Sequence, residues 1–296
     1  MVKNSAGPRP SKSLVLSGVW VVVILSCLWL VQAQTSPSSM PGQTGVDNDY
    51  QTYAILWTQS SAEYRALAYQ TFALAKLRLD ADLRRHPRVP QRRSRLARES
   101  SLPPAVVVDI DETVLDNSHF QAELVLRGLP YTPQGWTAWC ERAEAGAVPG
   151  AVDFLNYAAI RGVRVFYISN RLLSEKPGTI KNLQRLRFPN VTEATVMVRE
   201  EGMTSSKESR QKKIKERYRI ALLIGDNLND FNDDFVGKSI TDRAAQVDRE
   251  RAEFGARFIV VPNPMYGDWE KAIYENKAPL TEEEKRTYRR AALKGF

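Results

Sequence analysis

The sequence predicts an α/β fold in which helices flank a parallel β-sheet. Short apolar runs, rich in β-branched residues, alternate along the chain with longer stretches of helical pattern. This alternation is typical of parallel strands joined by right-handed helical crossovers. Residues 105–108 are apolar without a break, as expected for a strand buried on both faces. Three such runs end abruptly in polar residues, which places a candidate site at one edge of the sheet.

Size and composition allow one substantial core. The chain has 296 residues, of which 43% are hydrophobic and 26% charged, values that are ordinary for a globular protein. The formal net charge is +8, and it falls to +5 (39 basic minus 34 acidic residues) once the three basic residues of positions 1–33 are removed. This excess is too small to predict binding to a nucleic acid polymer.

Residues 1–33 have the pattern of a signal peptide. A basic start precedes the apolar run 14–31, and Ala33 ends a Val-Gln-Ala cleavage pattern. We therefore expect export, with the mature protein in the periplasm or at the outer membrane. Cleavage after Ala33 leaves Cys140 as the single thiol, so the fold must be stable without an internal disulfide.

Two alternatives to cleavage at Ala33 stay open, and both attach the protein to a membrane. Residues 24–27 (ILSC) resemble a lipoprotein processing site with Cys27 as the lipidated residue, although Leu25 is bulky for that role. The run 14–31 is also just long enough to remain as a membrane anchor.

The next segments lead into the sheet. Residues 34–48 have the composition of a flexible linker, and residues 49–85 predict one or two helices with a start at Ser60-Ser61. Residues 84–98 are rich in arginine, and Pro87 and Pro90 exclude a regular basic helix there. A solvated loop is the first interpretation of this stretch, and contact with an anionic membrane surface is the alternative.

The remaining elements are expected in a fixed order. They are a strand at 105–108, a helix within 118–147, a helix from 149 to about 158, a strand at 163–168, a helix at 179–186, a strand at 194–199, a helix at 205–218, strands at 220–224 and 258–261, and a charged terminal helix within 278–296.

Asp109 and Asp111 follow the first strand directly. Their spacing of two places both side chains on the same side of the chain, at the strand end where open α/β sheets hold ligands. Two carboxylates this close repel each other and need a cation or a shared proton. An acidic turn in solvent is the alternative.

The other strand ends add complementary groups. Ser169 and Asn170 follow the second strand, Asp226 follows a later one, and Lys207 lies on the helix before it. Because carboxyl ends of parallel strands face one crevice, these groups should meet Asp109. Carboxylates suit Mg²⁺, whereas a hydroxyl, an amide and an ammonium suit phosphoryl oxygens. A helix cap at Ser169-Asn170 and a surface position for Lys207 are the alternatives.

Gly225 and Asp230 flank this last acidic position. Gly225 is expected to let the backbone approach the metal, and Asp230 lies four residues after Asp226, on the same face if a helical turn begins there.

These motifs resemble those of the haloacid dehalogenase (HAD) superfamily. The four motifs are residues 109–113 (DIDET), 169–171 (SNR), Lys207 and 225–230 (GDNLND). More narrowly, residues 114–118 (VLDNS), 166–171 (FYISNR), 205–208 (SSKE) and 262–267 (PNPMYG) are similar to the bacterial class C acid phosphatases, which include outer-membrane lipoprotein 5'-nucleotidases. The likeness covers residues 49–270. It implies a Rossmann-like HAD fold with a small, mainly helical cap and N-terminal helices, within a domain at 49–277.

The resemblance implies roles for the acidic residues. Asp109 would be the nucleophile that forms an aspartyl phosphate, and Asp111 would be the general acid and then the general base. Mg²⁺ would be held by Asp109, by the backbone carbonyl of Asp111 and by Asp226, with Asp230 supporting Asp226 from behind.

The resemblance also implies how the substrate is held. Ser169, Asn170 and Lys207 would hold the transferring phosphoryl group. Aromatic rings would cover the leaving group, with Phe120 and Tyr266 as the first candidates and two tryptophans as others, at positions 136 and 139. His119-Phe120 stands where relatives commonly have Pro-Tyr, which leaves substrate preference open.

The sequence thus predicts an exported, Mg²⁺-dependent acid phosphatase or 5'-nucleotidase acting on nucleoside monophosphates and other small phosphomonoesters at mildly acidic pH. Two rival functions stay open: a phosphotransferase using the same intermediate, and an envelope lipoprotein that binds haem or nucleotides. Assembly into a homodimer also stays open.

Overall fold

The structure is a computed structural model that describes residues 48–87, 102–200 and 202–296. The predicted signal peptide, Cys27, nearly all of the predicted linker and most of the arginine-rich stretch lie outside these residues. Within the part of the chain that is described, no helix has both the length and the apolar character needed to cross a bilayer.

Five parallel strands form the central sheet, in the spatial order β5-β4-β1-β6-β7. The strands are β1 (Pro104–Val108), β4 (Arg164–Leu172), β5 (Val196–Arg199), β6 (Arg219–Gly225) and β7 (Phe258–Val260). The apolar run at 105–108 lies in β1, the middle strand, and every residue of β1 is buried. The predicted α/β fold with a parallel sheet is confirmed.

The register of β1 aligns its end with the end of β6 and with Tyr167 inside β4. Val108 pairs with Tyr167 on β4 and with Ile224 on β6. The next residue, Asp109, donates its backbone N–H to the carbonyl of Ile224 at 2.9 Å. The polar residues after β1 and β6 therefore begin at the same level of the sheet.

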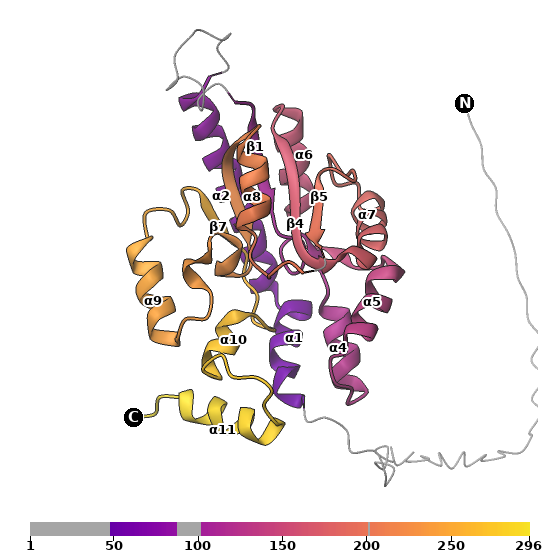
Figure 1. Cartoon of the computed structure of the whole chain (residues 1–296), viewed down its shortest axis with the longest axis vertical. Helices are drawn as coiled ribbons and strands as arrows, with labels where there is room; N and C mark the ends of the chain where they lie inside the picture. Colours follow the sequence, from indigo (N-terminus) through magenta and orange to yellow (C-terminus); the bar gives the residue numbers. More distant parts are fainter. Residues whose placement is uncertain (1–47, 88–101, 201) are drawn as a thin grey trace, which may run out of the picture. The chain divides into compact units, whose positions relative to one another are not determined.

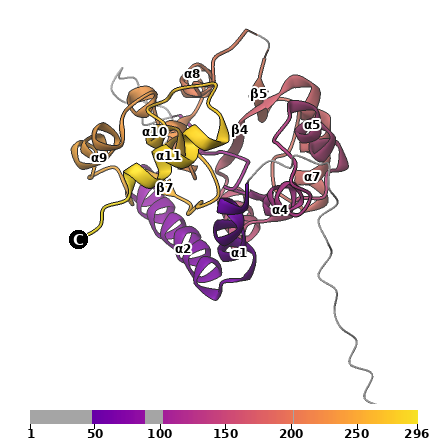
Figure 2. The same cartoon turned by 90° about the horizontal axis from the view of Figure 1, so that it is seen from below.

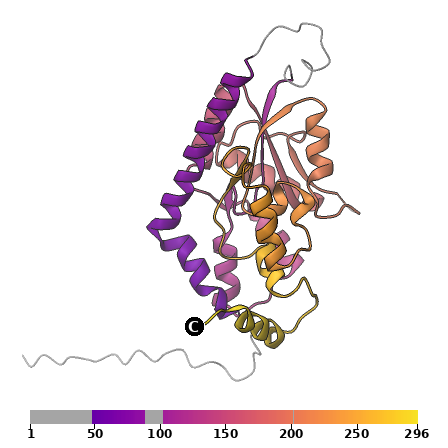
Figure 3. The same ribbon diagram turned by 90° about the vertical axis from the view of Figure 1, so that its left-hand side faces the viewer.

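Helices cover both faces of the sheet. The helices α2 (Ala62–Arg85), α6 (Ala151–Ile160) and α7 (Lys176–Arg185) pack on the face that includes Val106 and Val108. Helix α8 (Glu208–Lys215) packs on the opposite face, against Ala105 and Val107. This alternation follows from the two-residue period of a strand. Figure 3 shows α2 and α8 on opposite sides of the sheet.

Two helices form the start of the described domain. Helix α1 (Thr52–Ser60) and helix α2 are separated at Ser61, whose hydroxyl accepts the backbone N–H of Tyr64 at 3.0 Å. The sequence had predicted one or two helices here, and the structure has two. The Ser61 side chain caps the second helix, because it satisfies a free backbone N–H at the start of α2.

Smaller elements gather at one end of the sheet (Figure 1). They are α4 (Ser118–Leu126), α5 (Pro133–Arg142), the β2–β3 ribbon (Leu115–Asp116 with Gly146–Ala147), α9 (Ile240–Arg249), α10 (Asp268–Ile273), α11 (Glu282–Ala292) and the 3-10 turns Asp49–Gln51, Leu173–Glu175, Leu228–Asp230 and Asp233–Phe235. The ribbon, α9 and α10 were not predicted from the sequence. The terminal helix α11 was predicted. Arg289 of α11 donates, at 2.9 Å, to the hydroxyl of Tyr274, the residue just after α10. The two helices lie side by side in Figure 2.

Candidate active site

A cavity of about 680 Å³ opens where β1, β4 and β6 end. Its lining includes the acidic residues Asp109, Asp111, Asp226 and Asp230, the polar or basic residues Asn170, Arg171 and Lys207, and the aromatic residues Tyr131, Trp136 and Tyr266. Side chains that are far apart in the sequence therefore share one cavity, as predicted from the strand ends.

Three carboxylates meet inside this cavity. Asp109, Asp226 and Asp230 each offer an oxygen, and these oxygens lie within 4.8 Å of one another. Asp109 and Asp226 were expected to meet, and the structure brings them together. Asp230 was expected behind Asp226, whereas its carboxylate lies beside the other two. The Asp111 carboxylate is held elsewhere, by a different set of partners.

The turn after β6 explains the position of Asp230. Its Oδ2 accepts the backbone N–H of Asn227 at 3.0 Å, within a capping box that opens the 3-10 turn Leu228–Asp230. A Cβ atom added to Gly225 would lie 2.3 Å from that same oxygen. Gly225 is therefore needed to make room for Asp230, a role that the sequence did not suggest.

A single hydroxyl connects two of the carboxylates. Thr113 Oγ1 lies 3.1 Å from Asp109 Oδ2 and 3.0 Å from Asp226 Oδ1. Because a hydroxyl has one proton, it can donate to only one of these oxygens at a time. Asn263 donates to the other oxygen of Asp226 at 2.8 Å. The single Thr113 proton therefore cannot serve both carboxylates, so ionising them together depends on nearby positive charge or on an added proton.

Lys207 supplies one positive charge to the cluster. Its ammonium donates to Asp109 Oδ1 and, at 2.7 Å, to Asp230 Oδ1. Burial lowers the pKa of Lys207, but the two carboxylates outweigh burial and raise the pKa above its ordinary value. Lys207, the residue before α8, is only 4% exposed, whereas Lys212 and Lys213 within α8 are exposed, which excludes the surface interpretation.

The charges in this cluster do not balance. Burial raises the pKa of Asp109 to about 7, against the effect of Lys207 and with added repulsion from Asp230 and Asp111. Burial and the same kind of repulsion also hold the pKa of Asp226 well above its ordinary value. Three carboxylates and one ammonium leave two negative charges when all are ionised. The oxygen ligands, their spacing and this excess fit one divalent cation.

Asp111 faces a guanidinium instead. Arg171 Nη2 donates to Asp111 Oδ1 at 2.8 Å, Asn117 Nδ2 donates to the same oxygen at 3.0 Å, and Ser169 Oγ donates to Oδ2 at 3.1 Å. The sequence had predicted no role for Arg171. Its position could have been predicted from the spacing. Arg171 lies two residues after Ser169, and residues two apart in a strand point to the same side.

Ser169 and Asn170 lie inside β4, which excludes a helix cap. Ser169 was predicted to hold substrate, but it is fully buried and does not line the cavity, because its hydroxyl is used by Asp111. Asn170 does line the cavity, and its Oδ1 accepts from Arg210 at 2.8 Å. The guanidinium of Arg210 therefore orients the Asn170 amide.

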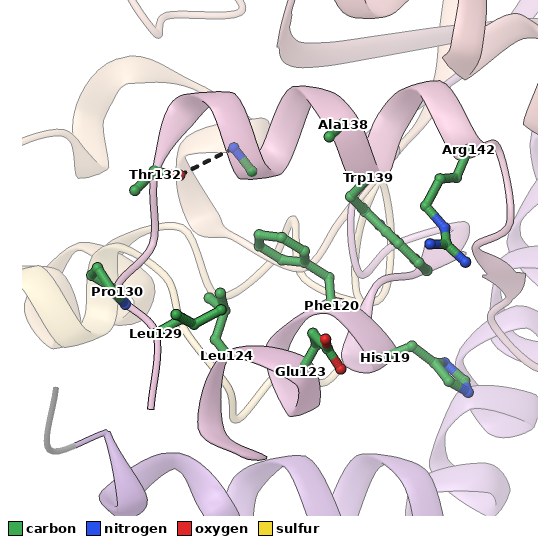
Figure 4. A pocket seen from close by; sticks show the side chains of 11 residues that line it. His119, Phe120, Glu123, Leu124, Leu129, Pro130, Thr132, Ala138, Trp139 and Arg142 are labelled. Carbon is green, nitrogen blue, oxygen red and sulfur yellow. Dashed lines mark hydrogen bonds between the residues drawn. The ribbon is translucent and has the colours of Figure 1, made fainter. Parts of the chain in front are cut away.

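Phe120 lies outside the carboxylate cavity. It packs with Leu124, Trp136 and Cys140, and it lines a second cavity of about 470 Å³ between α4 and α5. Figure 4 shows its ring pointing from α4 toward α5, with His119 at the edge of the same cavity. The predicted contact of Phe120 with a substrate is therefore not supported, because the ring is used in the hydrophobic contact between these helices.

Tyr266 does line the carboxylate cavity, together with Trp136 and Tyr131. The Tyr266 hydroxyl donates to Glu112 Oε2, which orients the ring. Burial, with repulsion from Asp111 and Asp226, raises the pKa of Glu112 well above its ordinary value. The aromatic side of the cavity is thus built by Tyr266, Trp136 and Tyr131 rather than by Phe120.

Comparison with known proteins identifies the class of enzyme. The family described as HAD superfamily, subfamily IIIB (acid phosphatase), matches residues 27–269. The class C acid phosphatase from Bacillus anthracis with tungstate bound is 41% identical, with a TM-score of 0.75 over 84% of this chain and 98% of that one. A second structure of the class C acid phosphatase from Bacillus anthracis gives 0.74 at the same identity and coverage.

The site and these matches define a phosphomonoesterase with the HAD fold. The chain belongs to subfamily IIIB of the HAD superfamily, the acid phosphatases.

A methyl group at Gly225 should disrupt the cluster. In Gly225→Ala, the new Cβ displaces the Asp230 carboxylate, and we expect phosphatase activity at fixed Mg²⁺ concentration to fall roughly 10–100-fold, with weaker metal binding. Gly146→Ala is the control, because nothing lies within 4 Å of its added Cβ, and its activity should stay within about twofold of wild type. Equal activity in the two variants would show that the position of Asp230 does not matter.

Metal stabilisation should depend on pH. An unfolded aspartate ionises near 3.8, whereas Asp109 in the cation-free protein keeps its proton up to about 7. The stability that this raised pKa contributes is therefore complete below 3.8 and is lost as pH rises through 7. A divalent cation replaces the proton, so Mg²⁺ should raise the Tm more at about pH 7.5 than at about pH 5.

Thermal unfolding with and without Mg²⁺ at both pH values measures this, with NaCl of equal ionic strength as the control. The same Tm increase at both pH values would mean that the cation does not compete with protons for these carboxylates.

Proposed function

We propose that the protein is an exported, Mg²⁺-dependent acid phosphatase with 5'-nucleotidase activity that works through an aspartyl phosphate. The observation that carries the proposal is the buried Asp109 carboxylate in a cavity that also contains Lys207, a second carboxyl group on Asp111 and two more carboxylates able to share a cation.

Asp109 and Asp226 would hold the Mg²⁺ ion, with the Asp230 carboxylate close enough to take part. The expected ligand set also includes the backbone carbonyl of Asp111. The bound ion would neutralise charge between the Asp109 carboxylate and the substrate phosphate.

The reaction would have two displacements. An oxygen of Asp109 attacks phosphorus, the bond from phosphorus to the ester oxygen breaks, and Asp111 gives its proton to that leaving oxygen. Water then attacks the phosphorus of the aspartyl phosphate and gives a proton to Asp111. The Asp109–phosphorus link breaks, which releases phosphate and restores both carboxyl groups.

Lys207 and Asn170 are the candidates for holding the transferring phosphoryl group. Both line the cavity, and each side chain is oriented by a neighbour: Lys207 by Asp230, and Asn170 by Arg210. Phosphoryl transfer depends mainly on positioning and electrostatics, so oriented donors are the main requirement. We assign Ser169, which was first expected to touch substrate, to holding Asp111 instead.

The aromatic side of the cavity supports nucleoside monophosphates as substrates. Trp136, Tyr131 and Tyr266 line the same cavity as the carboxylates. A nucleobase stacked on such rings gains about 1–3 kcal/mol with little preference among bases. A cavity of about 680 Å³ is also within the usual size for a small-molecule site.

Export is supported by the basic start, the apolar run 14–31 and the Val-Gln-Ala pattern that ends at Ala33. We propose that the mature enzyme acts in the periplasm or at the outer membrane, where nucleotides outside the cytoplasm would be its substrates. Lipidation at Cys27 remains the alternative to release by cleavage.

A phosphate-release panel tests the mechanism. Wild type with Mg²⁺ should release phosphate from nucleoside 5'-monophosphates, and Asp109→Asn should lower kcat by about 10⁴-fold or more because the nucleophile is lost. EDTA should abolish the wild-type activity, and added Mg²⁺ should restore it.

Asp153→Asn is the matched control for this panel. Asp153 is an exposed aspartate in the first turn of α6, so its activity should stay within about twofold of wild type. Equal phosphate release by wild type and Asp109→Asn would mean that the aspartyl-phosphate mechanism is wrong.

A further inference from the structure

Arg171 is a buried arginine at the cavity, and each of its three guanidinium nitrogens donates to a protein group. It is 3% exposed, and Nε and Nη2 donate to Asp111 Oδ1 at 3.0 and 2.8 Å. Its third nitrogen, Nη1, donates to Thr179 Oγ1 of α7 at 2.9 Å. A planar guanidinium held at both ends gives its carboxylate partner a fixed orientation.

The two oxygens of Asp111 are used unequally. Oδ1 accepts from Arg171 Nη2, Arg171 Nε and Asn117 Nδ2, all within 3.0 Å. Oδ2 accepts from Ser169 Oγ at 3.1 Å and more weakly from Arg171 Nε at 3.3 Å. The Ser169 hydroxyl can turn and accept a hydrogen bond instead. Oδ2 is therefore the oxygen of Asp111 with fewer fixed donors, and the one that is freer to face a leaving group.

The same network reaches the aromatic side of the cavity. The Arg171 guanidinium lies 5.3 Å from the ring centre of Trp136, which lines the cavity. The fully buried Asn117 accepts the indole N–H of Trp139 at 2.8 Å and donates to Asp111. Helix α5, which carries both tryptophans, is thus connected to the Asp111 carboxyl by a cation–π contact and a chain of hydrogen bonds.

We propose that Arg171 is a positioning residue for proton transfer to the leaving group. It holds Asp111 by Oδ1, which keeps Oδ2 directed at the ester oxygen of a leaving group that lies against Trp136. This inference rests on the proposed acid role of Asp111. It differs from a phosphate-binding role, because each guanidinium nitrogen of Arg171 already donates to Asp111 or Thr179.

The test compares two leaving groups in one variant. p-Nitrophenolate leaves without a proton, whereas the alkoxide of a nucleoside 5'-monophosphate needs one from Asp111. In Arg171→Gln, single-turnover release of nucleoside should fall about 10²-fold, and release of p-nitrophenolate should fall by less than about threefold. The measured quantity is the ratio of the two release rates within one variant. A smaller folded fraction of that variant lowers both rates equally and leaves the ratio unchanged.

Two further variants sharpen the test. Arg171→Lys keeps the charge but not the planar fork, so its rate ratio should lie between those of wild type and Arg171→Gln. Arg219→Gln removes another arginine paired with an aspartate, Asp82 at 2.7 Å, at the opposite end of β6, and its ratio should equal that of wild type. Inhibition by inorganic phosphate should be unchanged in Arg171→Gln.

Equal losses with both leaving groups, or weaker inhibition by phosphate, would overturn the inference, because either result indicates phosphate binding or general damage. Unchanged rates with both substrates would also overturn it. Failure of the proposed function has a different signature: wild type would release phosphate from neither substrate, or Asp109→Asn would retain activity.

Discussion

Mutual repulsion among Asp109, Asp226 and Asp230 is the constraint on which the site depends. Their oxygens lie within 4.8 Å of one another in a partly buried position, and Lys207 supplies only one compensating charge. Such a group is unfavourable without protons or a cation. The surrounding fold must therefore hold the carboxylates together. A divalent ion that binds there relieves their repulsion, which strengthens its binding.

The sheet provides that restraint. Asp109 is fixed to the end of β6 by its backbone hydrogen bond to Ile224, and Asp226 follows the last residue of the same strand. Because both strands are central and buried, their ends cannot separate without disrupting the core. Gly225 and the capping box after it bring in the third carboxylate.

Asp109 and Asp111 are close in the sequence, but their carboxyl groups contact different partners. Asp109 faces an ammonium and two carboxylates, whereas Asp111 faces a guanidinium, an amide and a hydroxyl. The two sets of partners keep the carboxyl groups apart within one site. The proposed roles of nucleophile and proton donor rest on the family to which the chain belongs.

The sequence predicted the sheet and most of the carboxylate site, because a buried strand that ends in acid is a strong local signal. It did not predict where longer side chains point. The expected strand at 163–168 continues to Leu172 as β4, which buries Ser169 and turns Arg171 onto Asp111. Phe120 was expected at the substrate, but its direction depends on the packing of α4 against α5, which no local pattern specifies.

The most direct measurement of the central claim is the number and affinity of bound divalent ions. Mn²⁺, followed by its electron paramagnetic resonance signal, can be titrated into wild type and Asp226→Asn. We expect one site per chain in wild type and at least a roughly tenfold weaker site in Asp226→Asn, because one of the clustered carboxylates is lost. Equal affinity in both proteins would mean that these carboxylates do not bind the ion.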